Sequence, residues 1–150
     1  MADSQASITG FHHAAIRAHD FDASVAFYTG VLGLTPKLSW EAPGQRAVML
    51  DAGRGDYLEI FERPDAPATP TEPEPPLLHV AFRTDALDAT LSAVRSAGMT
   101  VTMEARDIDI ANTEPDADQE GCLPAVVPVR IAFFRGPDGE HVELFQNELT

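Results

Sequence analysis

The chain carries the same pattern twice, and this internal repeat most constrains what it can fold into. Residues 11–34 and residues 78–98 each begin with a short apolar segment that holds a histidine. An aspartate follows this histidine six or seven residues later, and a helix-like segment then ends at a glycine. We therefore expect two related halves with the same order of strands and helix. The matched residues are His13 and His79, Asp20 and Asp85, and Gly33 and Gly98.

The spacing of apolar residues predicts the elements of each half. Alternation of apolar and polar residues indicates strands, and a spacing of three or four indicates helices. In the first half we expect strands at 11–18, 46–51 and 57–62, a further strand near 38–40, and a helix that Asp20 or Asp22 caps and Gly33 ends. In the second half we expect strands at 77–83, 99–103, 129–135 and 140–146, and a helix that Asp85 or Asp88 caps and Gly98 ends.

Two segments interrupt this pattern. Residues 64–76 contain six prolines in thirteen positions, which excludes a helix or a central strand and predicts an extended linker. The linker divides a single domain, 1–150, into a first module of about 8–63 and a second module of about 77–148. Residues 107–128 are acidic and hold three prolines, so we expect a long loop that only the second half has.

Composition excludes several classes of function. The formal net charge is −14, and such an acidic chain is repelled by nucleic acid and by anionic lipid. We expect neither a signal peptide nor a membrane span, because residues 1–10 hold neither a basic region nor an apolar core and no apolar run reaches the roughly 20 residues that span a bilayer. Cys122 is the only cysteine, so no internal disulfide forms. We expect a cytoplasmic protein whose partner is a small molecule.

Four chemically distinctive side chains lie on predicted strands, and in three of these strands the opposite face is mainly aliphatic; in the first strand His12 lies on that opposite face. Successive side chains of a strand point to opposite faces. On the first strand, His13 then shares a face with Phe11 and Arg17, whereas His12 points the other way. On the other three strands, Glu59 shares a face with Phe61, His79 shares a face with Arg83, and Glu143 shares a face with Phe145. A carboxylate among apolar residues is costly unless it is paired or binds a metal. Two imidazoles and two carboxylates suit Zn²⁺, Ni²⁺, Fe²⁺, Mn²⁺ or Co²⁺, with His12 as an alternative ligand to His13.

The chain resembles the vicinal oxygen chelate superfamily, which includes glyoxalase I, extradiol dioxygenases, methylmalonyl-CoA epimerase, and bleomycin- and fosfomycin-resistance proteins. The resemblance rests on HHAAIRAHDFDASVAFYTGVLGL, YLEIFE, LLHVAFRTDALDATLSAVRSAG and IAFFRGPDGEHVELFQ. The aromatic pair Phe27-Tyr28 before Leu32-Gly33 and the ending PDG-x-x-x-EL are its most specific motifs. The resemblance implies an α+β fold of two βαβββ modules, whose mostly antiparallel sheet curls around one divalent metal.

The same resemblance implies roles for individual residues. His13, Glu59, His79 and Glu143 match the four ligand positions, and a glutamate in the second of them resembles glyoxalase I, which is lactoylglutathione lyase. Arg17 matches the arginine that grips the glutathione carboxylate in that enzyme. Arg63, however, stands where bacterial glyoxalases place an asparagine, which argues against glutathione itself. Arg17 and Arg83 occupy equivalent places in the two halves, so we expect them, with Arg63 and Phe61, to bind a substrate that carries a carboxylate or a phosphate.

The function that this resemblance favours is that of a metal-dependent lyase or isomerase acting through an enediolate. Glu143 would be the base and Glu59 the second carboxylate. Two alternatives stay open: a non-catalytic protein that binds a small molecule, as antibiotic-resistance members do, and an Fe(II) dioxygenase that uses His13, His79 and Glu143. Members of the superfamily often form dimers, so we also expect a homodimer, with the site inside one chain or shared between two.

Overall fold

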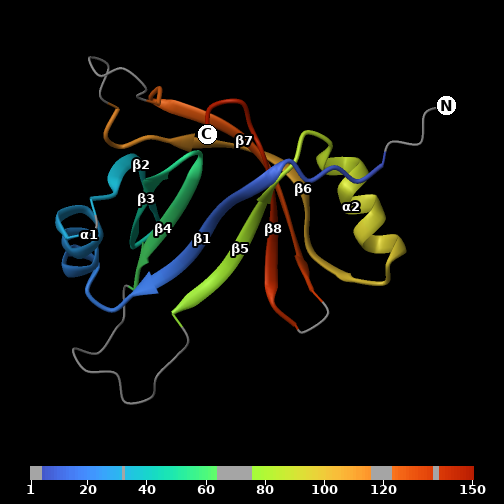
Figure 1. The fold of residues 1–150 in the computed structure, drawn as a ribbon, viewed down its shortest axis with the longest axis horizontal. Helices are drawn as coiled ribbons and strands as arrows, with labels where there is room; N and C mark the ends of the chain where they lie inside the picture. The colour runs from blue at the N-terminus through green and yellow to red at the C-terminus, as the bar shows by residue number, and fades with distance from the viewer. Residues whose placement is uncertain (1–4, 32, 64–75, 116–122, 137–138) are drawn as a thin grey trace. The chain divides into compact units, whose positions relative to one another are not determined.

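The computed structural model describes residues 5–31, 33–63, 76–115, 123–136 and 139–150. Two helices and eight strands follow one another in the order β1, α1, β2, β3, β4, β5, α2, β6, β7, β8 (Figure 1). No helix within these ranges is both long enough and apolar enough to cross a membrane. The bounds are β1 Gly10–Ala18, α1 Phe21–Gly30, β2 Thr35–Ala42, β3 Gln45–Gly53, β4 Asp56–Glu62, β5 Leu77–Arg83, α2 Leu87–Ser96, β6 Thr100–Ala111, β7 Val126–Arg135 and β8 His141–Gln146.

The chain divides into two compact units. The first unit comprises Met1–His13, His79–Asp109 and Pro128–Thr150, and the second unit comprises Ala14–Leu78 and Ile110–Val127. The strands are antiparallel apart from a parallel pair, β5 with β8, among the strand pairs whose register is described. This mixture of antiparallel strands with two helices confirms the expected α+β class.

In the second unit, α1 covers a sheet in which β2, β3 and β4 lie next to one another and the C-terminal part of β1 follows β4. Asp20 is the N-cap of α1, as predicted, because its Oδ1 accepts the backbone N–H of Ala23 at 2.9 Å. Val25 and Tyr28 of α1 pack against a buried cluster on the sheet. The cluster consists of Ala18, Val48, Leu50 and Ile60.

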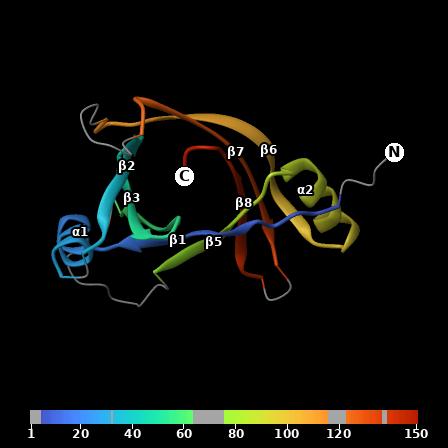
Figure 2. The same ribbon diagram turned by 45° about the horizontal axis from the view of Figure 1, so that its top comes forward.

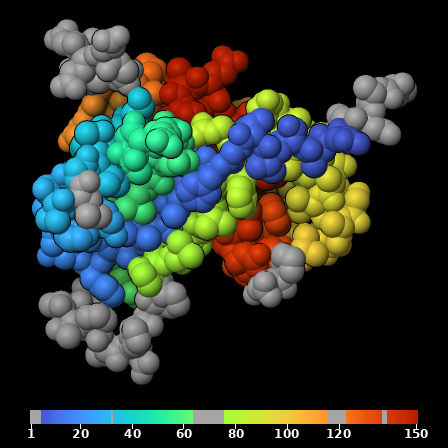
Figure 3. Space-filling view, viewed as in Figure 1, coloured from blue at the N-terminus to red at the C-terminus, as the bar shows by residue number. Residues whose placement is uncertain are grey.

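In the first unit, the strand order is β5, β8, β7, β6, with the start of β1 next to β5 (Figures 1 and 2). The space-filling view shows β5 and β8, in yellow-green and red, side by side on the surface of this unit (Figure 3). Leu87 and Leu91 of α2 pack on Ala132 of β7 and Leu144 of β8, so α2 covers this face of the sheet.

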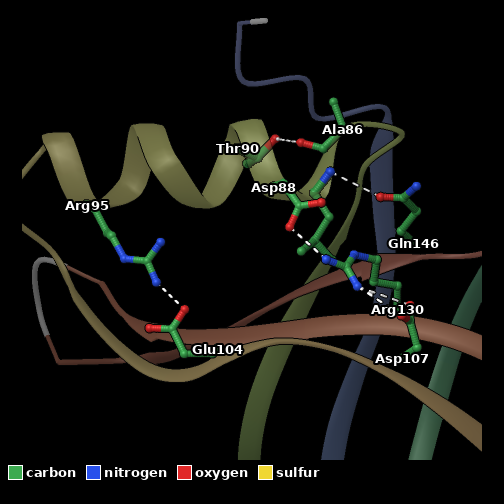
Figure 4. A network of polar contacts seen from close by, with 9 residues as sticks. Ala86, Asp88, Thr90, Arg95, Glu104, Asp107, Arg130 and Gln146 are labelled. Carbon is green, nitrogen blue, oxygen red and sulfur yellow. Dashed lines mark hydrogen bonds and ion pairs between the residues drawn. The ribbon is translucent and has the colours of Figure 1, made fainter.

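The start of α2 differs from the prediction. Its N-cap is Ala86, which makes no side-chain capping bond, so neither Asp85 nor Asp88 caps the helix. The backbone N–H of Leu87 instead donates to Oε1 of Gln146 at 3.0 Å, a residue at the end of β8 (Figure 4). Asp88 accepts a hydrogen bond from Arg130 at 2.7 Å (Figure 4). A distant side chain therefore satisfies the donor that the local sequence was expected to satisfy.

The expected loop 107–128 is shorter in the structure. β6 continues to Ala111, and β7 begins at Val126. The prediction was wrong because Ile108 and Ile110 extend the alternation of β6, in which the half-buried positions are apolar and most of the exposed ones are polar or charged. Three segments of the prediction lie outside the described residues. They are most of the proline-rich linker (64–75), the part of the expected loop that holds Cys122 (116–122), and the turn residues 137–138.

Candidate metal centre

Two neighbouring strands of the first unit bring His79 and Glu143 to one side of the sheet. β5 and β8 run parallel, with Ala81 directly opposite Glu143. His79 stands two residues before Ala81 and therefore on the same face. Leu144 packs in the core beneath α2, so its neighbour Glu143 points to the face away from that helix. Because the Ala81 side chain is small, larger side chains can lie beside Glu143 on this face.

His13, from the start of β1, completes a group of three. Its Nε2 lies 2.9 Å from Oε2 of Glu143 and 2.9 Å from Nε2 of His79, and the His79 Nε2 lies 3.1 Å from the same carboxylate oxygen. His13 is completely buried and Glu143 is 4% exposed. Three ligand atoms from three strands thus converge on one point, and within the described residues this is the group of side chains that could hold a metal ion.

The strict alternation of β1 fails at its two histidines. The prediction placed His12 opposite His13 and placed Phe11 beside His13. The structure buries both imidazoles completely. Phe11 instead contacts Phe82, with ring centroids 6.3 Å apart, and Phe82 pairs with Leu144 on the α2 side. Both histidines therefore lie on the face that carries Glu143.

His13, rather than its alternative His12, enters the group of ligand atoms. Nδ1 of His12 lies 2.7 Å from Nδ1 of His13, which is the nitrogen that faces away from Glu143. The His12 ring stacks on Phe145, with centroids 3.9 Å apart. Burial, and then the charges of His13 and Arg83, lower the pKa of His12 from 6.5 to about 3. His12 is therefore a neutral neighbour of His13.

Electrostatics hold Glu143 in its charged form. Burial by itself would raise the pKa of this carboxyl group, but the hydrogen bonds with His13 and His79 outweigh burial and lower the pKa from 4.5 to about 2. A buried carboxylate that stays ionised needs a positive partner in the same place. Either a proton on an imidazole or a bound cation meets that need.

The donor set fits a divalent transition metal. Imidazole nitrogens and carboxylate oxygens bind Zn²⁺ and related ions at about 2.0–2.2 Å. Atoms that lie 2.9–3.1 Å from one another can each be about 2.1 Å from a common centre when the bonds meet at about 90°. The three side chains would then occupy one face of the ion. This donor set alone does not select one metal.

Aromatic rings surround the group, and sequence reasoning did not assign them a role at this site. Phe133 stands opposite Glu143 in the antiparallel pair β7–β8. Its ring meets the edge of His79 with centroids 5.2 Å apart, and it also contacts His141 at 4.8 Å. Phe145 meets His13 in the same perpendicular way at 5.6 Å. The alternation of β7 and β8 was the signal that could have found both rings, because it puts them on the face of Glu143.

The other predicted site residues lie as follows. Glu59, on β4 of the second unit, is 7% exposed and pairs with Met49, and its role as fourth ligand stays a prediction. In the same unit Arg17 is exposed, and Phe61 packs edge-on against Trp40 with centroids 5.5 Å apart. Arg63 follows β4 and is half-buried. In the first unit the Arg83 guanidinium donates to the carbonyl oxygen of Thr150.

Comparison with known proteins finds relatives of similar length to this chain. The uncharacterized protein YaeR of Escherichia coli K12 is 30% identical over 138 residues, which is 90% of this chain and 94% of that protein. A lactoylglutathione lyase of Haemophilus influenzae is 28% identical over 141 residues, or 92% and 93% of the two chains. A probable lactoylglutathione lyase of Vibrio parahaemolyticus is 28% identical over 139 residues, or 91% and 89%.

Solved structures with the same fold include two epimerases. Methylmalonyl-CoA epimerase from Mycobacterium tuberculosis has a TM-score of 0.68 at 21% identity, over 99% of this chain and 96% of that chain. A variant of methylmalonyl-CoA epimerase from Streptomyces coelicolor, in complex with 2-nitronate-propionyl-CoA, has a TM-score of 0.61 at 28% identity, over 93% and 97%.

The sequence profile of the Glyoxalase/Bleomycin resistance protein/Dioxygenase superfamily matches residues 10–144, which include the three converging side chains. Nine-tenths of the chain thus follows one family pattern, and the fold and the relatives agree with it. The chain belongs to the Glyoxalase/Bleomycin resistance protein/Dioxygenase superfamily.

Proposed function

We propose that this protein is a metal-dependent lyase or isomerase. Its substrate would be a small molecule with oxygen atoms on two neighbouring carbons, from which the enzyme removes a proton to give an enediolate. The convergence of His13 Nε2, His79 Nε2 and Glu143 Oε2 within 3.1 Å carries this proposal. The names of the relatives, lactoylglutathione lyase and methylmalonyl-CoA epimerase, support a reaction of this class.

The chain supplies an anionic site with low access to water. A divalent cation, when bound by His13, His79 and Glu143, supplies Lewis-acid stabilisation of negative charge on the substrate. The burial of His13 and Glu143, with His79 half-buried beside them, strengthens the charge interactions among the three side chains. Phe133 and Phe145 keep the two imidazoles in place by edge contacts.

Two carboxylates are proposed to move the proton. With its pKa lowered to about 2, Glu143 is a weak base while it contacts both imidazoles. We assign it the removal of the proton after the arriving substrate has loosened these contacts, and we assign Glu59 the role of second carboxylate and fourth ligand. If so, Glu143→Gln abolishes turnover, and Glu59→Gln weakens the retention of the metal. Full turnover in Glu143→Gln would contradict the role of Glu143.

Cationic side chains are proposed to bind the acidic end of the substrate. Arg17, Arg63 and Arg83 suit a carboxylate or a phosphate, and Phe61 suits an apolar part of the molecule. Glutathione conjugates and CoA esters, which the names of relatives mention, both carry such groups.

The proposal also includes assembly and location: the protein forms a homodimer and works in the cytoplasm. Sedimentation velocity measures the assembly state.

Exchange of hydrogen for deuterium tests the reaction class before the substrate is known. Protein loaded with Zn²⁺, Ni²⁺ or Fe²⁺ is incubated in D₂O with the hemithioacetal of methylglyoxal and glutathione, with methylmalonyl-CoA, and with simple 2-hydroxy ketones. Proton NMR then follows the carbon next to the carbonyl. We expect metal-dependent exchange with at least one compound and none in Glu143→Gln. A hydroxamate that mimics an enediolate should bind the loaded protein, and binding without any exchange would favour the non-catalytic alternative.

A second candidate function rests on the same three residues. Two histidines and one carboxylate on one face of the ion are the ligand set of non-haem Fe(II) oxygenases. A dioxygenase would use His13, His79 and Glu143 and would leave Glu59 unbound. Oxygen consumption by the Fe²⁺-loaded protein with a catechol would support this function. Proton exchange without oxygen consumption would support the lyase or isomerase.

A further inference from the structure

His12 connects the candidate metal centre to the last residues of the chain. It lies next to His13 in sequence and is completely buried. Its Nδ1 lies 2.7 Å from Nδ1 of His13, and its Nε2 lies 2.6 Å from the hydroxyl oxygen of Thr150. The Thr150 hydroxyl in turn donates to Oδ1 of Asn147 at 2.9 Å. Four side chains therefore form one continuous line of polar contacts that begins at a proposed metal ligand.

The positions of the protons along this line depend on one another. A neutral imidazole carries one proton on its two nitrogens. His13 can offer Nε2 to a cation only when its proton lies on Nδ1, where it faces His12. Nδ1 of His12 must then accept, so the His12 proton lies on Nε2 and is donated to Thr150. The Thr150 hydroxyl accepts this bond and donates to Asn147 Oδ1, so every donor meets an acceptor.

The opposite arrangement blocks the metal site. If Nδ1 of His12 were the donor, the proton of His13 would lie on Nε2. That nitrogen is 2.9 Å from both Glu143 and His79, in the place that the cation would take. The direction of the hydrogen bond between His12 and His13 therefore decides whether His13 can act as a ligand.

Other contacts hold the distal end of the line in position. The Arg83 guanidinium donates to the carbonyl oxygen of Thr150, and the Thr150 backbone N–H donates to Asn147 Oδ1 at 3.3 Å. Phe145 supports the His12 ring by stacking, with an angle of 29° between the planes. The break in the alternation of β1 places His12 on this face. These features orient His12 and Thr150 toward the site.

We propose that His12, Thr150 and Asn147 form a hydrogen-bond relay that holds His13 in the tautomer able to bind a divalent cation. In this relay His12 and Thr150 are positioning residues that do not touch the cation. The inference rests on the proposed metal centre and adds to it an outer group of residues, with Arg83 as the anchor of Thr150. Groups that orient a ligating histidine in this way typically contribute 10- to 100-fold to metal affinity.

Zinc affinity measured in full-length variants tests the relay. His12→Phe keeps a ring against Phe145 but removes the acceptor, whereas His12→Asn keeps an acceptor oxygen near the position of Nδ1. Thr150→Val replaces the hydroxyl group with a methyl group of similar size. Thr29→Val is the matched control, because the Thr29 hydroxyl donates to the Val25 carbonyl of α1 at 2.8 Å. Competition with a chromophoric chelator gives the Kd for Zn²⁺ in each case.

We expect His12→Phe to weaken zinc binding about 10- to 100-fold, as outer groups that orient metal ligands do. Thr150→Val should weaken it by a smaller factor, His12→Asn should retain more affinity than His12→Phe, and Thr29→Val should match the natural chain. Thermal unfolding of each metal-free variant shows whether it folds. If His12→Phe does not fold, His12→Asn and Thr150→Val decide the matter, because they make smaller changes. Affinities within twofold of the natural chain in all the relay variants would overturn the proposal.

A second measurement separates this inference from the proposed function. Two-bond ¹H–¹⁵N NMR correlations report which nitrogen of His13 carries the proton in the metal-free protein. We expect a proton on Nδ1 of His13 in the natural chain, whether or not Nε2 also carries a proton toward Glu143, and a loss of the Nδ1 proton in His12→Phe. An Nδ1 of His13 that carries no proton in the natural chain would overturn the relay even if zinc binds. If the natural chain binds none of Zn²⁺, Ni²⁺ and Fe²⁺, the proposed function fails, and the tautomer of His13 still shows whether the relay exists.

Discussion

Replacement of His79 by glutamine should abolish the stabilisation of the protein by a divalent cation. A ligand at 100 times its Kd stabilises the folded state by about 2.7 kcal/mol. For a chain of 150 residues, each kcal/mol raises Tm by about 2–4 °C, so the natural protein should gain about 5–11 °C. His79 Nε2 lies 2.9 Å from His13 Nε2 and 3.1 Å from Glu143 Oε2, so its removal takes one of the two imidazoles from the proposed ligand set. At the same concentration of Zn²⁺ we expect a gain below about 2 °C.

Scanning calorimetry on chelator-treated protein, with and without zinc, measures this gain. The metal-free Tm of each variant is its own reference, which separates the loss of a ligand from the loss of the contact between His79 and Phe133. Two histidines serve as matched controls. His19 is exposed, and Nε2 of His141 lies 3.1 Å from the Thr102 hydroxyl. His19→Gln and His141→Gln should keep the full gain. An equal gain in His79→Gln, or no gain in the natural chain, would refute the metal centre.

Three further predictions concern the scaffold and its response to pH. Leu144→Ala should lower the free energy of unfolding by about 2–5 kcal/mol in urea titrations, because Leu144 is 1% exposed, whereas Leu149→Ala at a 42% exposed site should cost much less. Gly98→Ala should destabilise by about 1 kcal/mol, since Gly98 has a φ of +82°, whereas Gly30→Ala at the end of α1 should be neutral or stabilising; equal effects would contradict this reasoning. The pKa of Glu143 is lowered in the fold, so its contribution to stability is present above pH 4.5 and disappears as the pH falls toward 2. Metal-free protein should therefore lose on the order of 3 kcal/mol more than Glu143→Gln in urea titrations across this window, and equal losses would refute the assigned pKa.

Local patterns predicted much of the fold. The alternation of β4 and β8 placed Glu59 and Glu143 opposite Ile60 and Leu144, and the structure packs both of these aliphatic residues in cores beneath the helices. Asp20 caps α1 as predicted, because an N-cap bond joins residues three positions apart. Such contacts depend on a few neighbouring residues, so a pattern along the chain is enough to find them.

Contacts between distant segments could not be read in this way. Gln146, and not a nearby aspartate, satisfies the first N–H of α2, and it comes from a strand about 60 residues further on. The length of β6 was underestimated because acidic residues on its exposed side masked the alternation of Ile108 and Ile110. In both cases the deciding partner or surface belongs to the tertiary structure.

The sequence by itself determined the repeat, the superfamily and the residue types of the proposed metal site. Only the tertiary structure decided that His13, rather than His12, meets His79 and Glu143, and that His12 turns toward Thr150 instead. The physical reason is that strand alternation predicts the face of a side chain but not the register between strands, and it fails where β1 breaks its own pattern. Of the two adjacent histidines, His13 therefore lies among the proposed ligands, and His12 lies behind His13, between it and Thr150.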